Sequence, residues 1–310
     1  MIVSEDESLI VSSLGWIDHG SLWVLEARSG KVSRMQISDA DYLSLHPGEH
    51  NHFSVVHHYS RADQAQISVH SFSDPARVLA RVRFAPSGHL FEGEPTVWRL
   101  VPKAYVAYLN LPSVSNYYLL LIKPTNLTAE VVRLEWFDDW YDKDYQAVIS
   151  VVEVPGQNKL LFSVQRDSHP VLYDLERREA VARLSLAERF GNPTLRFRRL
   201  AQELWADDYD TLVCLSTKDW SIKNSLRLQG ESGGVAQFIG EYTFNHDESL
   251  CAVARPFSGD VVAVDTQRFK VTHSCSLGAQ PLAVALLTNG TVYARDWKSG
   301  RLLKGHLRKR

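Results

Sequence analysis

The histidines are the residues with the most evident chemical potential. Positions 46–58 read HPGEHNHFSVVHH and contain five of the chain's twelve histidines, which are His46, His50, His52, His57 and His58. Imidazole nitrogens bind transition metals when several converge, usually beside a carboxylate or a thiolate. In an extended segment His50 and His52 would share one face, whereas His57 and His58 would point in opposite directions. This spacing matches no known metal-ligand motif.

The same segment fits a loop at Pro47 and Gly48 that leads into a strand. Its histidines would then lie at the strand end or form hydrogen bonds within the fold. A metal site and a pH-sensitive surface are the alternatives. We expect the loop and strand, and therefore neither a stoichiometric metal at the five histidines nor a cofactor.

A second candidate is the acidic–aromatic segment, residues 135–146, with the sequence EWFDDWYDKDYQ. Aromatic rings supply buried area in an interface, and carboxylates select a basic partner. The rings could instead pack on a neighbouring sheet, or the segment could hold an ion or a sugar. A calcium loop is disfavoured because the segment has no glycine for the sharp bend.

We assign the partner-binding role to eight residues of this segment. Trp136, Trp140 and Tyr141 are the candidate anchors, and the carboxylates supply steering charge. The full set is Trp136, Phe137, Asp138, Asp139, Trp140, Tyr141, Asp142 and Asp144.

The stretch GESGG at 230–234 is similar to the sequence around the nucleophile of trypsin-like proteases, with Ser232 in the nucleophile position. A serine nucleophile needs a base and an orienting acid, and the family's Ala-Ala-His-Cys segment is absent. A glycine-rich loop is the simpler interpretation. No phosphate-loop or dinucleotide-binding motif occurs, so we assign no catalytic residue.

Composition narrows the class of protein. Hydrophobic residues make up 45% of the 310 positions and the formal net charge is −2, which indicates a globular chain without broad attraction for nucleic acid or anionic lipid. The apolar runs are too short to cross a membrane, and the first residues do not resemble a signal peptide. Three widely spaced cysteines favour a reducing, cytoplasmic location over a disulfide framework.

The chain is organised by a repeated hairpin pattern, in which an apolar run, a polar turn and a second run follow one another. The pattern recurs at intervals of about 44 residues, the length of one four-stranded propeller blade. The predicted hairpins span 21–37, 67–84, 117–136, 170–186, 210–228, 259–277 and 290–307.

Other predicted strands lie between these hairpins, such as KLLFSV at 159–164 and SLCAVA at 249–254. They are apolar on both faces, as expected for strands covered on both sides. No linker divides the chain, so we expect one domain over 1–310. The first and last sheets each lack one strand, and the N-terminal SLIVSSL could complete either. We expect the C-terminal tail, HLRKR at 306–310, to be solvated.

Two segments carry a resemblance to known repeats. VYARDWKSGRLLKGH at 292–306 resembles the end of a WD repeat, and VLYDLERREAVARL at 171–184 resembles both that unit and the YVTN-type propeller repeat. The chain departs from the WD pattern because Asp296 precedes Trp297, and because convincing Gly-His copies are missing elsewhere. The resemblance implies an all-β fold, a seven-bladed β-propeller of four-stranded antiparallel blades.

The fold expectation leads to two functions. The first is a non-catalytic protein–protein interaction module, a scaffold or adaptor subunit whose protein partner has a basic surface. The alternative is a propeller hydrolase, similar to lactonases, with its active site at the mouth of the central channel. Such sites collect His, Arg, Asp and Glu from several blades and leave no local motif, so three or more ionisable groups gathered there would favour the enzyme.

Overall fold

The computed structural model describes residues 1–59, 64–85, 88–110, 115–133, 148–164, 169–184, 194–198, 201–208, 210–228 and 239–310. The chain forms two compact units, 1–138 and 139–310, and each is described by itself. Within the described ranges the helices are α1 (Gly15–Asp18) and α2 (Pro95–Trp98), of four residues each. The expectation of an almost entirely β structure is confirmed.

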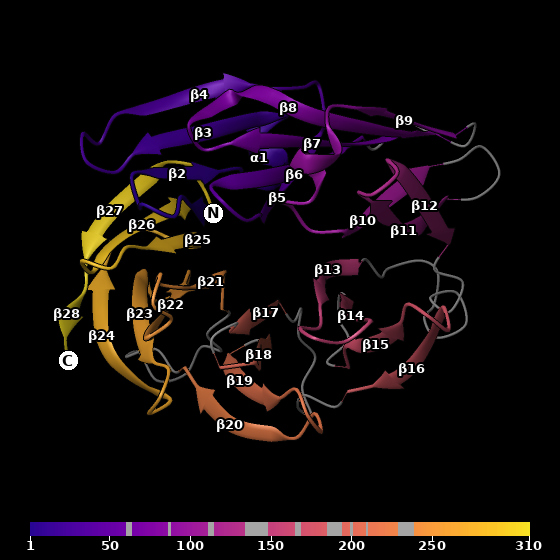
Figure 1. Ribbon diagram of the computed structural model, residues 1–310. Coiled ribbons are helices and arrows are strands. Elements are labelled where there is room, and N and C mark those ends of the chain that lie inside the picture. The colour runs from indigo at the N-terminus through magenta and orange to yellow at the C-terminus, as the bar shows by residue number, and fades with distance from the viewer. Residues whose placement is uncertain are drawn as a thin grey trace. The chain divides into compact units, whose positions relative to one another are not determined.

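In the part of the first unit that the structure describes there are three antiparallel sheets, in which strands that follow one another in sequence are hydrogen-bonded neighbours (Figure 1). The first sheet is β1 (Ile2–Val3), β2 (Leu9–Ser12), β3 (Ser21–Glu26) and β4 (Val32–Gln36). The second is β5 (Tyr42–Pro47), β6 (His52–His58), β7 (Ala65–Ser71), β8 (Asp74–Ala85) and β9 (Gly88–Glu92). The third is β10 (Ala104–Asn110), β11 (Ser115–Lys123) and β12 (Thr128–Arg133). The N-terminal SLIVSSL supplies β2 and thereby completes the first sheet.

Over its described residues the second unit contains four sheets, with the same sequential pairing except for β28. The fourth sheet is β13 (Val148–Glu153), β14 (Lys159–Val164), β15 (Val171–Asp174) and β16 (Glu179–Arg183). The fifth is β17 (Leu195–Arg198), β18 (Glu203–Asp208), β19 (Thr211–Ser216) and β20 (Ile222–Arg227). The sixth is β21 (Tyr242–Phe244), β22 (Leu250–Arg255), β23 (Asp260–Asp265), β24 (Lys270–Ser276) and β28 (Arg308–Lys309). The seventh is β25 (Pro281–Leu286), β26 (Thr291–Asp296) and β27 (Leu302–His306).

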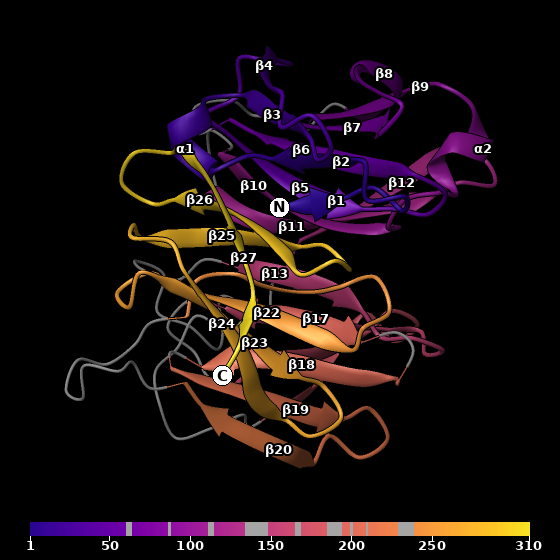
Figure 2. The same cartoon turned by 90° about the vertical axis from the view of Figure 1, so that its left-hand side faces the viewer.

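The C-terminal tail corrects the expectation of a solvated end. Its backbone forms β28, which adds a fifth strand to the sixth sheet by pairing Arg308 with Ser274 and Lys309 with His273. The C-terminal end, marked C, lies beside β24 in both views (Figures 1 and 2). The Arg310 N–H also donates to the Thr272 carbonyl oxygen at 2.9 Å. Leu307 is buried, whereas the side chains of His306 and of the three bases at 308–310 are exposed. The expectation of a solvated end therefore holds for these four side chains but not for Leu307 or for the backbone. The backbone pairs because an edge strand presents open hydrogen-bonding groups.

All seven predicted hairpins are present, each as the pair of strands expected from its sequence. KLLFSV forms β14, and SLCAVA forms most of β22. Central strands such as β22 and β26 are buried along nearly their whole length, whereas β4 and β20 are largely exposed. This difference explains why the central strands lack polar alternation, since both of their faces are covered.

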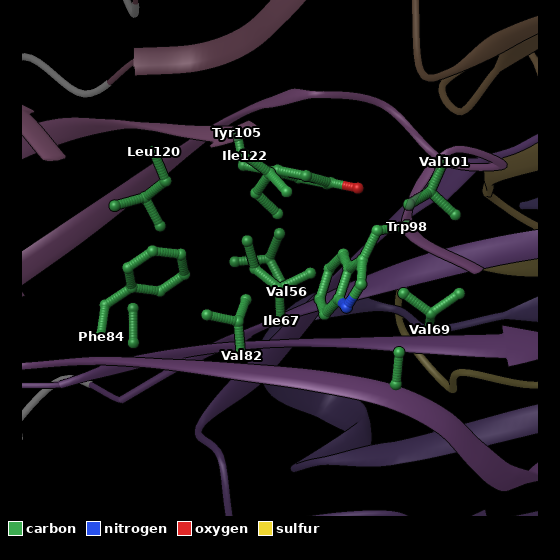
Figure 3. Close-up of a cluster of buried hydrophobic side chains, with 12 residues drawn as sticks. Val56, Ile67, Val69, Val82, Phe84, Trp98, Val101, Tyr105, Leu120 and Ile122 are labelled. Carbon is green, nitrogen blue, oxygen red and sulfur yellow. The ribbon is translucent and has the colours of Figure 1, made fainter. Parts of the chain in front are cut away.

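Adjacent sheets share apolar cores. In the first unit, Val56, Ile67 and Val82 of the second sheet pack with Tyr105 and Leu120 of the third (Figure 3). The fully buried Trp98 of α2 joins this cluster and fills the space beside Val69 and Val101. In the second unit the fully buried Trp205 has the same role between the fifth and sixth sheets. Within each unit, the sheets therefore bury apolar side chains against their neighbours.

Candidate functional site

The acidic–aromatic segment lies outside the described residues. None of the eight assigned partner-binding residues, Trp136, Phe137, Asp138, Asp139, Trp140, Tyr141, Asp142 and Asp144, has a described position. Their assignment therefore stays a prediction. The GESGG stretch with Ser232 also falls outside the described ranges.

The histidine segment forms part of the β5–β6 hairpin. The strand after the loop was expected, whereas Pro47, expected in the loop, is the last residue of β5 and pairs with Phe53. The tight turn is at His50 and Asn51, whose φ angles are 50° and 59°. His50 is therefore in a left-handed turn, and the face that it was expected to share with His52 in an extended segment does not form. The His52 Nδ1 lies 2.7 Å from the His50 carbonyl oxygen.

The other three histidines of the segment have local partners. His46 packs edge-on against Tyr105, with ring centroids 5.3 Å apart. His58 stacks on Tyr42 and its Nε2 lies 2.9 Å from the Ser44 Oγ. Over the described ranges no group of three or more His, Cys, Asp or Glu side chains could hold a metal ion. The expected absence of a stoichiometric metal remains a prediction for elemental analysis.

His57 belongs to a buried hydrogen-bond chain with Ser68 and His70, and its directions can be worked out. The His70 Nδ1 faces the Pro75 carbonyl oxygen at 3.0 Å, so it must donate. The neutral His70 ring then accepts at Nε2 from the Ser68 hydroxyl, 2.7 Å away. Ser68 Oγ in turn accepts from the His57 Nε2–H, also at 2.7 Å. The His57 Nδ1 lone pair has no hydrogen-bond partner among the described residues.

The hydrogen-bonded group places the Ser68 hydroxyl between two imidazoles, as in a catalytic site. The burial of Ser68 nevertheless rules out a nucleophilic role for this hydroxyl. Ser68 and His70 are fully buried and His57 is 1% exposed, so no substrate can reach the hydroxyl. Burial, together with the nearby His70 and Arg81, lowers the pKa of His57 to about 3. Burial also lowers the pKa of His70 to about 4. Both rings are therefore neutral at pH 7. The hydrogen bonds from His57 through Ser68 to His70 have a structural role in the second sheet.

Ionisable groups also gather on β17 and β18 of the fifth sheet and on β21 of the sixth. Asp207 is 4% exposed and accepts a 2.6 Å hydrogen bond from the Thr194 backbone N–H. The Tyr242 hydroxyl donates to the Trp205 carbonyl oxygen at 2.6 Å, and Arg196 lies over the Tyr242 ring. Burial raises the pKa of Asp207 to about 8, so this carboxyl is protonated at pH 7. A protonated acid could act in catalysis, but Asp207 and Tyr242 are too buried to contact a substrate, and this group does not favour the enzyme.

An exposed aromatic pair is the surface feature that stands out in the second unit. Phe257 follows β22 and Trp297 follows β26, in turns of neighbouring sheets. Their side chains are 52% and 37% exposed, and the rings meet edge to face with centroids 6.2 Å apart. We call these two residues the aromatic pair. The other large exposed apolar residues are scattered singly over other elements, which is ordinary for a protein surface.

Each turn that carries the pair is held by a buried arginine. Arg255 is 2% exposed, and its Nε donates to Asp260 Oδ1 at 2.8 Å across the mouth of the first turn. Arg295 is fully buried and its Nε donates to the Gly300 carbonyl oxygen at 2.6 Å in the second turn. Each turn is therefore held by a buried guanidinium group. Loss of its hydrogen bonds would leave a buried charge without a partner and would destabilise the fold.

The second turn is also tied to the loop before β25. The Asp296 carboxylate accepts from the backbone N–H groups of Ser299 and Gln280, both at 2.9 Å. The Trp297 N–H donates to the Gln280 carbonyl oxygen at 2.8 Å. Gly300 has a φ of 65°, a conformation that glycine adopts without strain. These contacts fix the backbone beneath an exposed indole, which is the arrangement of a preorganised contact residue.

Our sequence interpretation missed this pair, although the sequence carries a signal for it. The WD-like segment that contains Trp297 was used only to infer the fold, and Phe257 was not assigned a role. Both turns begin with alanine, arginine, one further residue and then an aromatic residue, at 254–257 and 294–297. Comparison of corresponding turns, instead of separate motifs, would have found the repeat.

Comparison with known proteins supports the fold. No protein-family model matches the chain, and no curated protein is significantly similar in sequence. Among solved structures, the β-propeller domain of Cps50 (Swd1) from Myceliophteria thermophila is similar, with a TM-score of 0.66. The match covers 98% of this chain and 94% of that domain, at 9% sequence identity. The chain is thus an all-β propeller of seven blades, and over the described residues each blade is a sheet of three to five strands.

This similarity supports the fold and not a function, because 904 chains of solved structures match and the sequence identity is low. None of the described helices has the length or apolar character needed to cross a membrane.

Proposed function

We propose that this protein is a non-catalytic protein–protein interaction module, a scaffold or adaptor subunit of a larger assembly. The observation that carries the proposal is the aromatic pair, Phe257 and Trp297, exposed on two turns that buried arginines hold in place. Exposed aromatic residues on a rigid support are the side chains that most often dominate binding energy at interfaces. The WD-like propeller fold is consistent with such a role, by analogy only.

Two further parts of the proposal come from the sequence. The acidic–aromatic segment would provide a second contact surface, one that selects a basic partner. We place the protein in a reducing, cytoplasmic environment because its three cysteines are unpaired, buried thiols.

The test is an affinity pull-down in which tagged full-length protein is the bait and bound proteins are quantified by mass spectrometry. The paired variant Phe257→Ser with Trp297→Ser removes both rings. The matched control is Ile222→Ser, which removes a 47% exposed apolar side chain from β20 of the same unit. Thermal melting is measured for every variant, because Trp297 is only 37% exposed and its removal also takes away packing contacts. Binding is compared at a temperature at which all variants are folded.

We expect a stoichiometric partner with the unsubstituted protein and with Ile222→Ser, and its loss with the paired variant. Two results would contradict the proposal. One is the absence of any stoichiometric partner. The other is a partner that the paired variant and the variant Trp140→Ala both retain in full.

A further inference from the structure

The acidic side chains of the two turns that carry the aromatic pair bind groups in or beside these turns. Arg255 binds the Asp260 carboxylate through two nitrogens, and Asp296 accepts hydrogen bonds from Ser299 and Gln280 within the second turn. These carboxylates are satisfied by the turn itself. The Arg255–Asp260 pair is neutral overall, whereas Asp296 keeps its negative charge but is only 8% exposed.

The basic residues of the second turn are in the opposite situation. Lys298 follows Trp297 directly and Arg301 closes the turn, and both side chains are exposed. Neither forms an ion pair with any residue that the structure describes. The Arg301 carbonyl oxygen accepts the Asp296 N–H at 2.9 Å, so the backbone that carries this arginine is fixed. Two rings and two exposed basic side chains therefore share one short turn region, in which the acidic side chain, Asp296, is buried.

We propose that Phe257, Trp297, Lys298 and Arg301 form the docking site for an acidic segment of a partner protein. The segment would carry one large apolar side chain flanked by aspartate or glutamate. This inference rests on the proposed function and names the chemistry of the partner. The apolar side chain covers the rings, while the carboxylates pair with Lys298 and Arg301.

The division of roles follows from the exposure of the groups. Exposed ion pairs add little affinity, so the positive charges act on the choice of partner and the rate of association. Buried aromatic contacts set the lifetime of the complex. A single-stranded nucleic acid could also stack on aromatic rings beside basic residues, but such grooves track the backbone with several positive charges. The net charge of −2 and only two bases at this site favour the acidic peptide.

The experiment is a selection of random twelve-residue peptides displayed on phage against the immobilised full-length protein. Selected peptides are synthesised with a fluorescent label, and their affinity is measured by fluorescence anisotropy. The variants are the paired Phe257→Ser and Trp297→Ser, and the paired Lys298→Glu and Arg301→Glu. Lys270→Glu is the control, because Lys270 is an exposed base at the start of β24 in the same unit. Labelled twelve-residue oligothymidylate is tested in parallel.

We expect selected peptides with an apolar residue flanked by acids. Removal of both rings should weaken their binding by about 30-fold or more. The Lys298→Glu and Arg301→Glu variant should weaken acidic peptides and select basic ones, whereas Lys270→Glu should retain the original preference.

Different results overturn different claims. Peptides that depend on the rings but show no acidic enrichment would refute the partner chemistry and leave the interaction module intact. Oligothymidylate binding that depends on the rings would replace the peptide with a nucleic acid. Selected peptides that all bind the ring-deficient variant normally would eliminate this docking site, while the pull-down with Trp140→Ala would still test the module.

Discussion

Replacement of Asp207 by asparagine should stabilise the protein, and by an amount that depends on pH. The Asp207 carboxyl is 4% exposed and its Oδ1 accepts the Thr194 N–H at 2.6 Å. Burial raises its pKa from an ordinary value of 3.8 to about 8. The folded protein therefore holds a proton on this carboxyl that the unfolded chain releases above pH 4. Asparagine keeps the Oδ1 acceptor and needs no proton, which removes this dependence.

The size of the effect follows from proton linkage. A raised pKa in the folded state means that the stability contribution is complete below pH 4 and is lost as the pH rises towards 8. Each pH unit in that window costs about 1.4 kcal/mol, so the loss is about 4 kcal/mol at pH 7 and about 2 kcal/mol at pH 5. Asp207→Asn should gain these amounts relative to the unsubstituted protein, with the gain levelling above pH 8.

Urea denaturation of both proteins, followed by tryptophan fluorescence between pH 5 and 9, measures the difference. The matched control is Asp247→Asn. Asp247 is exposed, and its hydrogen bonds with Ser249 hold the pKa of its carboxyl below the usual range. Substitution there should be neutral or slightly destabilising at every pH, because an ionised and hydrogen-bonded carboxylate is lost.

The reasoning about burial would be refuted by an Asp207→Asn protein that has the same free energy of unfolding as the unsubstituted protein at pH 7. A gain that does not change between pH 5 and pH 8 would also refute it, because such a gain could not come from the proton.

Three further predictions concern the histidines and the acidic–aromatic segment. The pKa values of His57 and His70 are lowered on folding, so their stability contribution is complete above about pH 6.5 and is lost as the pH falls. Acidification of the Asp207→Asn protein from pH 7 to pH 5 should therefore cost about 2 kcal/mol per histidine in urea denaturation, and an unchanged midpoint would exclude their neutral burial. Elemental analysis of untagged protein should find no stoichiometric zinc, nickel or copper, and one metal per chain that is lost on substitution of His50 and His52 would contradict this. Trp140→Ala should weaken partner binding by about 2 kcal/mol if its ring is an interface anchor. A variant that melts several degrees lower yet binds normally would show that the ring packs inside the fold.

The repeated hairpins show which parts of the fold can be predicted from sequence periodicity. Strands such as β14 and β22 were predictable because a β-strand covered on both faces must be apolar throughout, and because the turns between strands need particular residues. Hairpin pairing is local, so the order of strands within a sheet follows from the chain itself. The pairing of β28 with β24 was not predictable in this way, because it joins segments more than thirty residues apart in sequence.

The hydrogen-bond partners and protonation states of individual side chains could not be predicted from the sequence. Five histidines in thirteen residues suggested a metal site or a strand, and only the fold showed that His57 pairs through Ser68 with His70 of another strand. Asp207 is one aspartate among many in the sequence, and its raised pKa arises from the sheets that bury it.

The amino-acid sequence determined the class of fold, the positions of the strands and the absence of a recognisable catalytic motif, because these depend on local periodicity and spacing. Only the tertiary structure decided which aromatic residues are exposed. Phe257 and Trp297 lie forty residues apart, and their rings meet because neighbouring sheets place equivalent turns side by side. Burial and electrostatic environment depend on contacts between distant segments, which a single sequence does not specify.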